Sequence, residues 1–237
     1  PFRDLDKKEI EKLLKTAMRR SERYRVYTKE MGQTKEEAYA SFDVKKKMKI
    51  FSWNGDIDTI MTPRDSMLYY KKFLRTGLLS MEPQTGYVKA WVGGINHKYF
   101  KYDHAKQGKR QVGSTFKPIL YATAIDQLKY SPCDTISDSY YCIAEGRYGI
   151  LEDWCPKNAN GKYSGMISLK SALAKSINTI SAKLIDRVGP KNVIQMAHNL
   201  GIKNDIPEMP SIALGTPELS LYEMVNSYST LANMGQY

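Results

Sequence analysis

The sequence predicts an α+β fold in two parts: a small module of helices and one hairpin over residues 1–77, and a larger part over residues 78–237. This division follows from a change of pattern at Leu78, where a strand-like hairpin begins and apolar helical segments follow it. The charge is also uneven along the chain. Residues 1–120 hold 26 lysines and arginines against 14 acidic residues, whereas residues 121–237 hold 10 against 11.

The first module opens with two helix signals. Asp6 and the glutamate three positions later form a capping box, and apolar residues recur behind it at helical spacing as far as Met18. Thr34 and the glutamate three positions later form a second capping box. It predicts a short helix that runs through Ala40.

A hairpin and a third helix complete this module. Residues 48–53 and 58–61 are strand-like, and Asn54-Gly55 between them is a strong signal for a two-residue turn. Thr62 followed by a proline predicts a helix start, with the helix running to Gly77. We find no catalytic constellation here, and expect a basic linker module.

The larger part begins with a second hairpin. Residues 78–82 and 87–92 alternate as strands do, and residues 83–86 supply a four-residue turn. Residues 95–112 read as a loop, and residues 119–128 as a strongly apolar helix. Such a helix is expected to be buried.

The remaining elements are mainly helical. Residues 130–167 are rich in Gly and Pro and read as loops. A cap at Ser168 predicts one long helix to about Val188, and a second helix covers about 191–199. Ser220 opens a third capping box and a helix that ends near Gly235. Its inward residues are predicted to be Leu221, Met224, Val225 and Tyr228.

Cysteine spacing argues against a metal site. Cys133, Cys142 and Cys155 form no C-x-x-C pair, so zinc is not expected, and no other cofactor is implied. One bridge can form if the protein is exported, and we favour Cys142–Cys155. The alternative for each cysteine is a free buried thiol.

The basic front half could face nucleic acid, anionic lipid or an anionic polymer. No nucleic-acid motif accompanies the charge, and a solvated helical face would also explain it. No run of 18 apolar residues is present. The chain begins with Pro1 and not with Met, so we expect it to be a fragment of a longer protein.

The segment from Gly113 to Pro118 carries the main chemical signal. Ser114 and Lys117 stand three positions apart, so on a helix the amine can reach the hydroxyl. Pro118 fits only near a helix start, which places Ser114 where free N–H groups favour an oxyanion. An acyl-transfer nucleophile with its own base is one interpretation. A helix start with an exposed lysine is the other.

A second motif supports the chemical interpretation. Ser176-Ile177-Asn178 lies 62 residues after Ser114. Ser-x-x-Lys followed by Ser-x-Asn is the pairing found in penicillin-binding proteins and serine β-lactamases. Several segments resemble the transpeptidase domain of class A, bifunctional penicillin-binding proteins in the same order, namely 82–86 with 90–94, 110–118, 154–158 with 163–165, 212–216 and 228–233.

The resemblance implies a D,D-transpeptidase that cross-links peptidoglycan stem peptides and is acylated by β-lactams. Ser114 would attack the carbonyl of a D-Ala-D-Ala bond, and Lys117 would take its proton. Ser176 would relay a proton to the leaving amine, and Asn178 would bind the peptide and orient the lysine. The family also implies the periplasmic face of the inner membrane, and a glycosyltransferase part and anchor before Pro1. Residues 1–77 could contact an anionic membrane surface.

The sequence departs from the family at one motif. No Lys-Thr-Gly or Lys-Ser-Gly follows Asn178. Arg75-Thr76-Gly77 resembles it but precedes the nucleophile, and we interpret it as a helix end with a glycine cap. We therefore expect residues 78–237 to be the N-terminal portion of a transpeptidase domain, truncated before the third motif and inactive alone.

Two other functions remain open. One is another acyl-serine enzyme, a D,D-carboxypeptidase or a serine β-lactamase, although no motif supplies a hydrolytic water. The other is a non-catalytic binding module or pseudoenzyme whose basic half docks on a partner.

Overall fold

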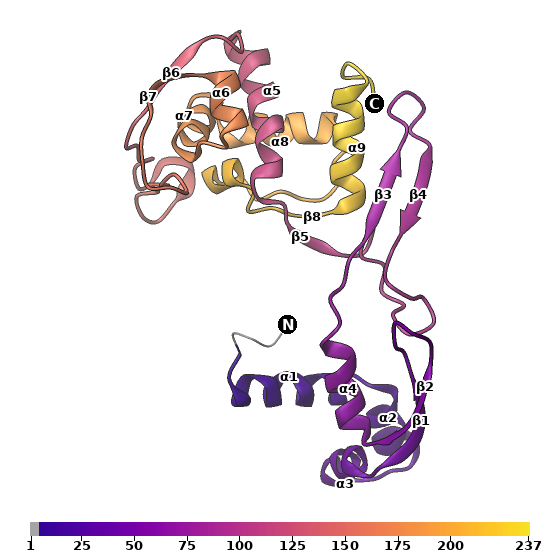
Figure 1. Ribbon diagram of the computed structural model, residues 1–237. Helices are drawn as coiled ribbons and strands as arrows, with labels where there is room; N and C mark the ends of the chain where they lie inside the picture. Colours follow the sequence, from indigo (N-terminus) through magenta and orange to yellow (C-terminus); the bar gives the residue numbers. More distant parts are fainter. Residues whose placement is uncertain (1–4) are drawn as a thin grey trace. The chain divides into compact units, whose positions relative to one another are not determined.

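The structure is a computed structural model that describes residues 5–237. The chain divides between Arg75 and Thr76 into two compact units, each with its own hydrophobic core. The first unit packs its core around Leu14, Met18 and Phe42. The elements of this unit (Figure 1) are α1 (Lys7–Arg19), α2 (Glu22–Arg25), a π-helical turn (Val26–Glu30), α3 (Lys35–Ala40), a 3₁₀ turn (Ser41–Asp43), β1 (Lys46–Ile50), β2 (Ile57–Met61) and α4 (Pro63–Lys71).

Both predicted capping boxes are present in this unit. The Asp6 carboxylate accepts the N–H of Glu9 at 2.7 Å, and the Glu9 carboxylate accepts the N–H of Asp6 in return. Thr34 and Glu37 make the same exchange at the start of α3. The helix starts at these two positions are therefore confirmed.

The turn of the first hairpin differs from the prediction. Ile50 pairs with Ile57, so six residues connect the strands in place of a two-residue turn at Asn54-Gly55. Two tyrosines of α4 explain the early end of pairing. The N–H of Phe51 donates to the Tyr70 hydroxyl at 3.0 Å, and the Tyr69 hydroxyl donates to the Phe51 carbonyl at 2.8 Å.

Helix α4 is also shorter than predicted. It ends at Lys71, so Gly77 is not its cap. The side chain of Arg75 donates to the carbonyl of Tyr70 at 3.0 Å and lies over the helix end. Gly77 instead lies where the backbone around Ala105 approaches closely. A Cβ there would lie 3.1 Å from the backbone nitrogen of Ala105, which only a residue without a side chain accommodates easily.

The second unit contains short strands and helices. Its elements in chain order are β3 (Leu78–Met81), β4 (Val88–Val92), β5 (Lys109–Gln111), a 3₁₀ segment (Gly113–Phe116), α5 (Lys117–Leu128), β6 (Thr135–Asp138), a 3₁₀ turn (Arg147–Gly149), β7 (Gly165–Ser168), α6 (Leu169–Ala174), α7 (Asn178–Val188), α8 (Pro190–Asn199), a 3₁₀ segment (Pro210–Leu214), β8 (Glu218–Ser220) and α9 (Leu221–Ala232).

Helix α5 is the central element of this unit. Phe116 just before it, and Ile119, Leu120 and Ala124 within it, are fully buried, as the apolar pattern predicted. It packs against α7 and α8 (Figure 1). Each fully buried Ile, Leu or Phe stabilises the fold by about 1.5–3 kcal/mol. The start of α5 is therefore held firmly from behind.

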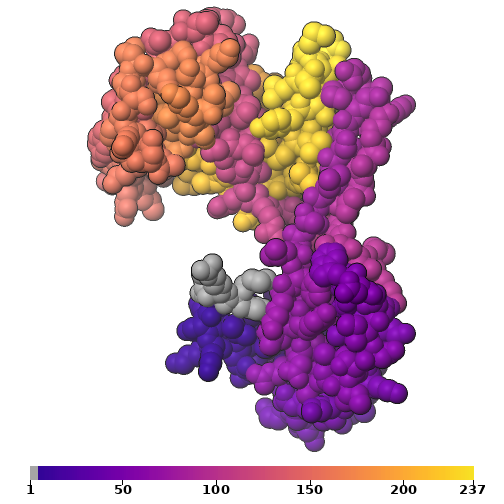
Figure 2. Space-filling model, viewed as in Figure 1, coloured from indigo at the N-terminus to yellow at the C-terminus, as the bar shows by residue number. Residues whose placement is uncertain are grey.

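The predicted leading hairpin forms, and two strand pairs were not predicted. β3 and β4 pair antiparallel with six residues between Met81 and Val88, and β3 lies beside α9. Figure 2 shows the outer surface of α9 in yellow next to the hairpin. β5 pairs with β8, and β6 with β7. β5, β6 and most of β7 fall in segments predicted as loops, and no strand was predicted at β8. These strands are only three or four residues long, too short for alternation to reveal them.

The predicted helix from Ser168 to Val188 is two helices. α6 ends at Ala174 and α7 begins at Asn178, because Ser176 adopts a left-handed conformation with φ of 54°. The N–H of Ser176 donates to the Leu173 carbonyl and the next N–H donates to the Ala172 carbonyl. This is a Schellman ending, with serine where glycine is usual. It places Ser176 between two helices and not inside one.

Helix α9 starts at the predicted capping box. Glu223 is buried, and its carboxylate accepts from the Ser220 hydroxyl at 2.8 Å and from the N–H groups of Lys203 and Asn204. Although burial raises the pKa of Glu223, these donors hold it below its usual value. Of the residues predicted to face inward, Met224 is buried, whereas 40% of Tyr228 is exposed.

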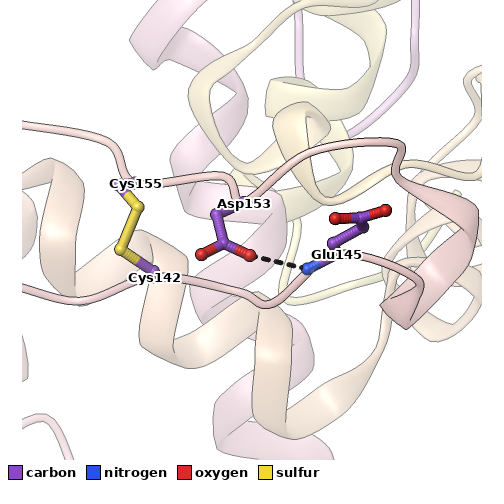
Figure 3. The surroundings of a disulfide bond; sticks show 4 residues. All are labelled: Cys142, Glu145, Asp153 and Cys155. Carbon is purple, nitrogen blue, oxygen red and sulfur yellow. Dashed lines mark hydrogen bonds between the residues drawn. A yellow bond between two sulfur atoms is a disulfide. The ribbon is translucent and has the colours of Figure 1, made fainter.

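The favoured disulfide is present. Cys142 and Cys155 are bonded, and the N–H of Glu145 donates to Asp153 at 2.9 Å within the bridged loop (Figure 3). Cys133 is a free, exposed thiol and not a buried one.

Among residues 5–237, no helix is both long and apolar enough to cross a bilayer. No cluster of metal-ligating side chains occurs in the same range.

Candidate active site

The turn that carries Ser114 is built by two glycines in close contact. The N–H of Gly113 donates to the Gly215 carbonyl at 2.9 Å, and φ is positive at both glycines. A Cβ on Gly215 would lie 1.7 Å from the Gly113 carbonyl oxygen, so no other residue fits there. After this contact the chain forms a 3₁₀ segment and then α5, with Pro118 in the first helical turn as predicted.

The two residues of the first motif differ in exposure. Ser114 is exposed at the start of the 3₁₀ segment, whereas Lys117 is buried, with 1% of its surface exposed. The interpretation of Lys117 as an exposed lysine at a helix start is therefore wrong. The hydroxyl of Tyr228 on α9 donates to the Thr115 carbonyl at 2.8 Å and ties down the segment between them.

The buried amine of Lys117 contacts the second motif. It donates to the Ser176 carbonyl at 2.8 Å, the Ser176 hydroxyl at 3.0 Å and Asn178 Oδ1 at 2.7 Å. Burial lowers its pKa to about 8. A lysine with such a pKa can take and return a proton near neutral pH.

The left-handed residue allows these contacts. Because Ser176 lies in the break between α6 and α7, both its carbonyl and its hydroxyl reach the lysine. A non-glycine residue in this conformation costs about 1–2 kcal/mol. Such strain is often found at functional sites.

Asn178 is oriented from both ends of its amide. Its Nδ2 donates to the Lys157 carbonyl at 2.9 Å, which leaves Oδ1 facing Lys117. Its backbone N–H donates to Asn158 Oδ1 at 3.0 Å, and that of Thr179 does so at 3.2 Å. Asn158 thus caps α7 from 20 residues earlier in the chain.

A mainly apolar cavity of about 730 Å³ lies beside the Ser114 turn. It includes Thr115 but none of the four predicted site residues. Its other lining residues come chiefly from β5, β8 and α9, and include Arg110, Val112, Leu219, Met224, Val225 and Tyr228.

The structure thus joins three of the four predicted site residues by hydrogen bonds. These are Lys117, Ser176 and Asn178, and Ser114 lies in the segment that leads into Lys117. The sequence analysis did not identify the buried group behind Asn178, namely Asn158, Asp138 and Thr179. Nothing in the spacing of these residues signals a shared site.

Two family models match the chain. Residues 76–237 match the penicillin binding protein transpeptidase domain, and residues 1–74 match the penicillin-binding protein middle domain. A penicillin-binding protein 1A from Aquifex aeolicus is 37% identical over 164 residues, which are 68% of this chain and 22% of that protein. The chain therefore spans about a fifth of the length of this relative.

Solved structures show the same fold. Penicillin-binding protein 1A from Haemophilus influenzae superposes with a TM-score of 0.63 at 28% identity, over 67% of this chain and 23% of that one. The penicillin-binding protein PonA1 from Mycobacterium tuberculosis superposes at 0.58 with 26% identity, over 68% and 43%. The predicted α+β transpeptidase fold is confirmed, and the chain belongs to the penicillin-binding protein transpeptidase family.

Proposed function

We propose that this chain carries the nucleophile half of a peptidoglycan D,D-transpeptidase. One observation supports this most strongly. The amine of Lys117 is buried, has a lowered pKa and binds both polar residues of the second motif, which lie 59 and 61 positions away. A lysine with a purely structural role would need hydrogen-bond acceptors. It would not need to lie three residues after an exposed serine, or to have the hydroxyl and the amide of the second motif as its acceptors.

The reaction follows from these positions. Neutral Lys117 takes the proton of Ser114 as its oxygen attacks the carbonyl carbon of a D-Ala-D-Ala bond. The C–N bond then breaks, and Ser176 relays the proton from Lys117 to the leaving D-alanine nitrogen. The product is an ester on Ser114. An acceptor amine from a second stem peptide attacks this ester. The ester C–O bond breaks, the proton that the amine loses returns to the oxygen of Ser114, and the new amide bond is the cross-link. A β-lactam would form a similar ester when its ring opens.

The developing oxyanion needs N–H donors. The first residues of a helical segment lack intrahelical acceptors, so the N–H of Ser114 can serve as one donor. Asn178 would hydrogen-bond the peptide while it holds Lys117.

We assign residues 1–77 to a basic linker module and residues 78–237 to the N-terminal portion of the transpeptidase domain. The whole activity belongs to a protein of the relatives' length, in which further residues would supply the third motif, the glycosyltransferase part and a membrane anchor. The site would lie on the extracytoplasmic face of the inner membrane. The disulfide supports this placement, because such bonds persist in oxidising compartments.

Fluorescent penicillin tests the proposal on the natural full-length protein. We expect one label per chain, slow release, and loss of labelling in Ser114→Ala, with Ser80→Ala as the matched control on the exposed hairpin. Fast release of opened penicillin would indicate a β-lactamase. Release of D-alanine without cross-linking would indicate a carboxypeptidase. Unchanged labelling in Ser114→Ala would contradict the assignment and favour a binding module.

A further inference from the structure

A buried polar cluster lies behind the second motif and contributes no group to the reaction described above. Its centre is Asp138, the last residue of β6, with 1% of its surface exposed. The carboxylate accepts from the Thr179 hydroxyl, from Asn158 Nδ2 at 2.9 Å and from the N–H of Ser164 at 2.7 Å. A buried carboxylate is costly unless donors of this kind surround it.

The donors fix the charge state of Asp138. Although burial raises its pKa, the hydrogen bonds hold it below the usual value, so the group is an anion at neutral pH. Lys183 on α7 supplies a positive charge nearby, with its amine bound to the Ser137 carbonyl at 2.6 Å and to the Ser139 hydroxyl at 2.8 Å. An anion accepts hydrogen bonds only, and this selects which end of Asn158 faces it.

The contact with Asp138 sets the orientation of the Asn158 side-chain amide. Its Nδ2 group donates to Asp138 and to the Lys162 carbonyl, so its oxygen must face the opposite way. That oxygen accepts the first two N–H groups of α7, from Asn178 and Thr179. Helix α7 has no side-chain cap from its own preceding residue, so this contact sets where the helix begins.

We propose that Asp138 and Asn158 are positioning residues that hold the start of α7, so that Asn178 and Ser176 meet the amine of Lys117. The chain of contacts runs from Asp138 to Asn158, from Asn158 to the Asn178 backbone, and from the Asn178 side chain to Lys117. It joins β6, the loop around residue 158, α7 and α5. The inference rests on the proposed role of Lys117 as the base.

Two variants separate the two functions of Asn158. Asn158→Ala removes both the contact to Asp138 and the cap on α7. Asn158→Asp keeps an acceptor for the two N–H groups but sets a second carboxylate against Asp138, so it tests the contact between the two residues. In the double variant Asp138→Asn with Asn158→Asp, one donor and one acceptor again face each other. The matched control is Asn160→Ala, an exposed asparagine in the same loop.

The test uses the natural full-length protein and fluorescent penicillin at increasing concentration. This separates the saturating acylation rate constant from the dissociation constant of the non-covalent complex. In both single variants we expect the rate constant to fall about 10–100-fold. The dissociation constant should change little, the double variant should recover part of the rate, and Asn160→Ala should equal wild type.

Two outcomes would overturn the inference. One is wild-type acylation in the folded fraction of Asn158→Ala when only its melting temperature has fallen, which is the behaviour of a merely structural residue. The other is a crystal structure of that variant in which Lys117 still donates to Asn178 and Ser176. The second measurement needs no labelling. The proposed function is judged separately, by whether wild type is labelled.

Discussion

At the scale of single residues, the surroundings of Lys117 matter most. Its amine has three acceptors and the side chain is buried, so the amine is positioned by hydrogen bonds while burial lowers its pKa. With a pKa of about 8, it would be mostly charged at pH 7 but readily neutralised. An ordinary lysine, with a pKa of about 10.4, would not be readily neutralised at this pH.

Acylation should therefore depend on pH. Lys117 must be neutral to accept a proton, so the rate of labelling by fluorescent penicillin should rise about tenfold per pH unit below 8 and level off above it. Lys117→Arg should lose at least about a hundredfold at all pH values, because arginine stays charged. Lys191→Arg, at an exposed position, is the control. A rate that does not change between pH 6 and pH 9 would refute the role of the amine.

Ser176 combines a strained backbone with a useful hydroxyl, and two substitutions can separate them. Ser176→Gly and Ser176→Ala both remove the hydroxyl and should both slow acylation. Only glycine adopts the left-handed conformation without strain. The free energy of unfolding, measured by urea denaturation, should therefore be about 1 kcal/mol higher for Ser176→Gly than for Ser176→Ala. Equal stability of the two variants would show that the positive φ carries no strain.

The candidate site residues stand out in the sequence, but how they meet in the fold does not. Ser114 and Lys117 stand out because their spacing and the following proline act locally. Ser176 appeared to lie inside a helix, because a left-handed helix end is usually marked by glycine and a serine there gives no such signal. Asn158 and Asp138 act through folding partners at least 20 residues away, so spacing does not signal their role.

At the scale of elements, the apolar helix α5 and the capping boxes were predictable, whereas the short strands and the break between α6 and α7 were not. The boxes at Asp6, Thr34 and Ser220 each start a helix as expected, because both partners lie within one turn. β5 and β8 are three residues each and lie about a hundred positions apart, so their pairing is decided by the surrounding fold.

The contact between Gly113 and Gly215 offers a test at this scale. Gly215→Ala adds a Cβ that would overlap the Gly113 carbonyl, in a residue whose φ is 80°. We expect a loss of about 2–4 kcal/mol in the free energy of unfolding, together with slower acylation. Gly161→Ala is matched in backbone conformation, with φ of 67°, but meets nothing within 4 Å, so it should lose only about 1 kcal/mol. Similar losses in both would rule out the overlap.

The disulfide should stabilise the second unit through its loop. Cys142 and Cys155 are 13 positions apart, and closing a loop of that size contributes about 3 kcal/mol to the free energy of unfolding. Replacing both with alanine should lower the denaturation midpoint accordingly, whereas Cys133→Ala at the exposed thiol should change it little. Chemical denaturation measures both. An unchanged midpoint in the double variant would show that the bond is dispensable.

At the scale of the whole molecule, the two units differ in net charge per residue. Residues 1–75 hold 19 lysines and arginines against 12 acidic residues, whereas residues 76–237 hold 17 against 13. The excess per residue is several times greater in the first unit. Lys46, Lys47 and Lys49 stand exposed along β1 and are part of this excess.

We therefore expect the first unit to bind an anionic membrane surface. In a sedimentation assay, the chain should pellet with phosphatidylglycerol vesicles at low salt and stay in the supernatant at high salt. It should not pellet with pure phosphatidylcholine vesicles. Replacing the three β1 lysines with glutamine should weaken binding at least about tenfold. The same change at exposed Lys170, Lys191 and Lys203 is the control. An equal loss in both variants would argue for general charge attraction without a preferred surface.

The bond from Tyr228 to the Thr115 carbonyl has a consequence for synthesis. The two residues are 113 positions apart, so the segment after Ser114 gains this support only when α9 has left the ribosome. The contacts of Lys117 with Ser176 and Asn178 also wait for some 60 further residues. Contacts of such wide sequence separation form late, because a long loop must close first. The nucleophile is therefore made before its supports, so a nascent chain that has not yet released α9 lacks part of the support of the site.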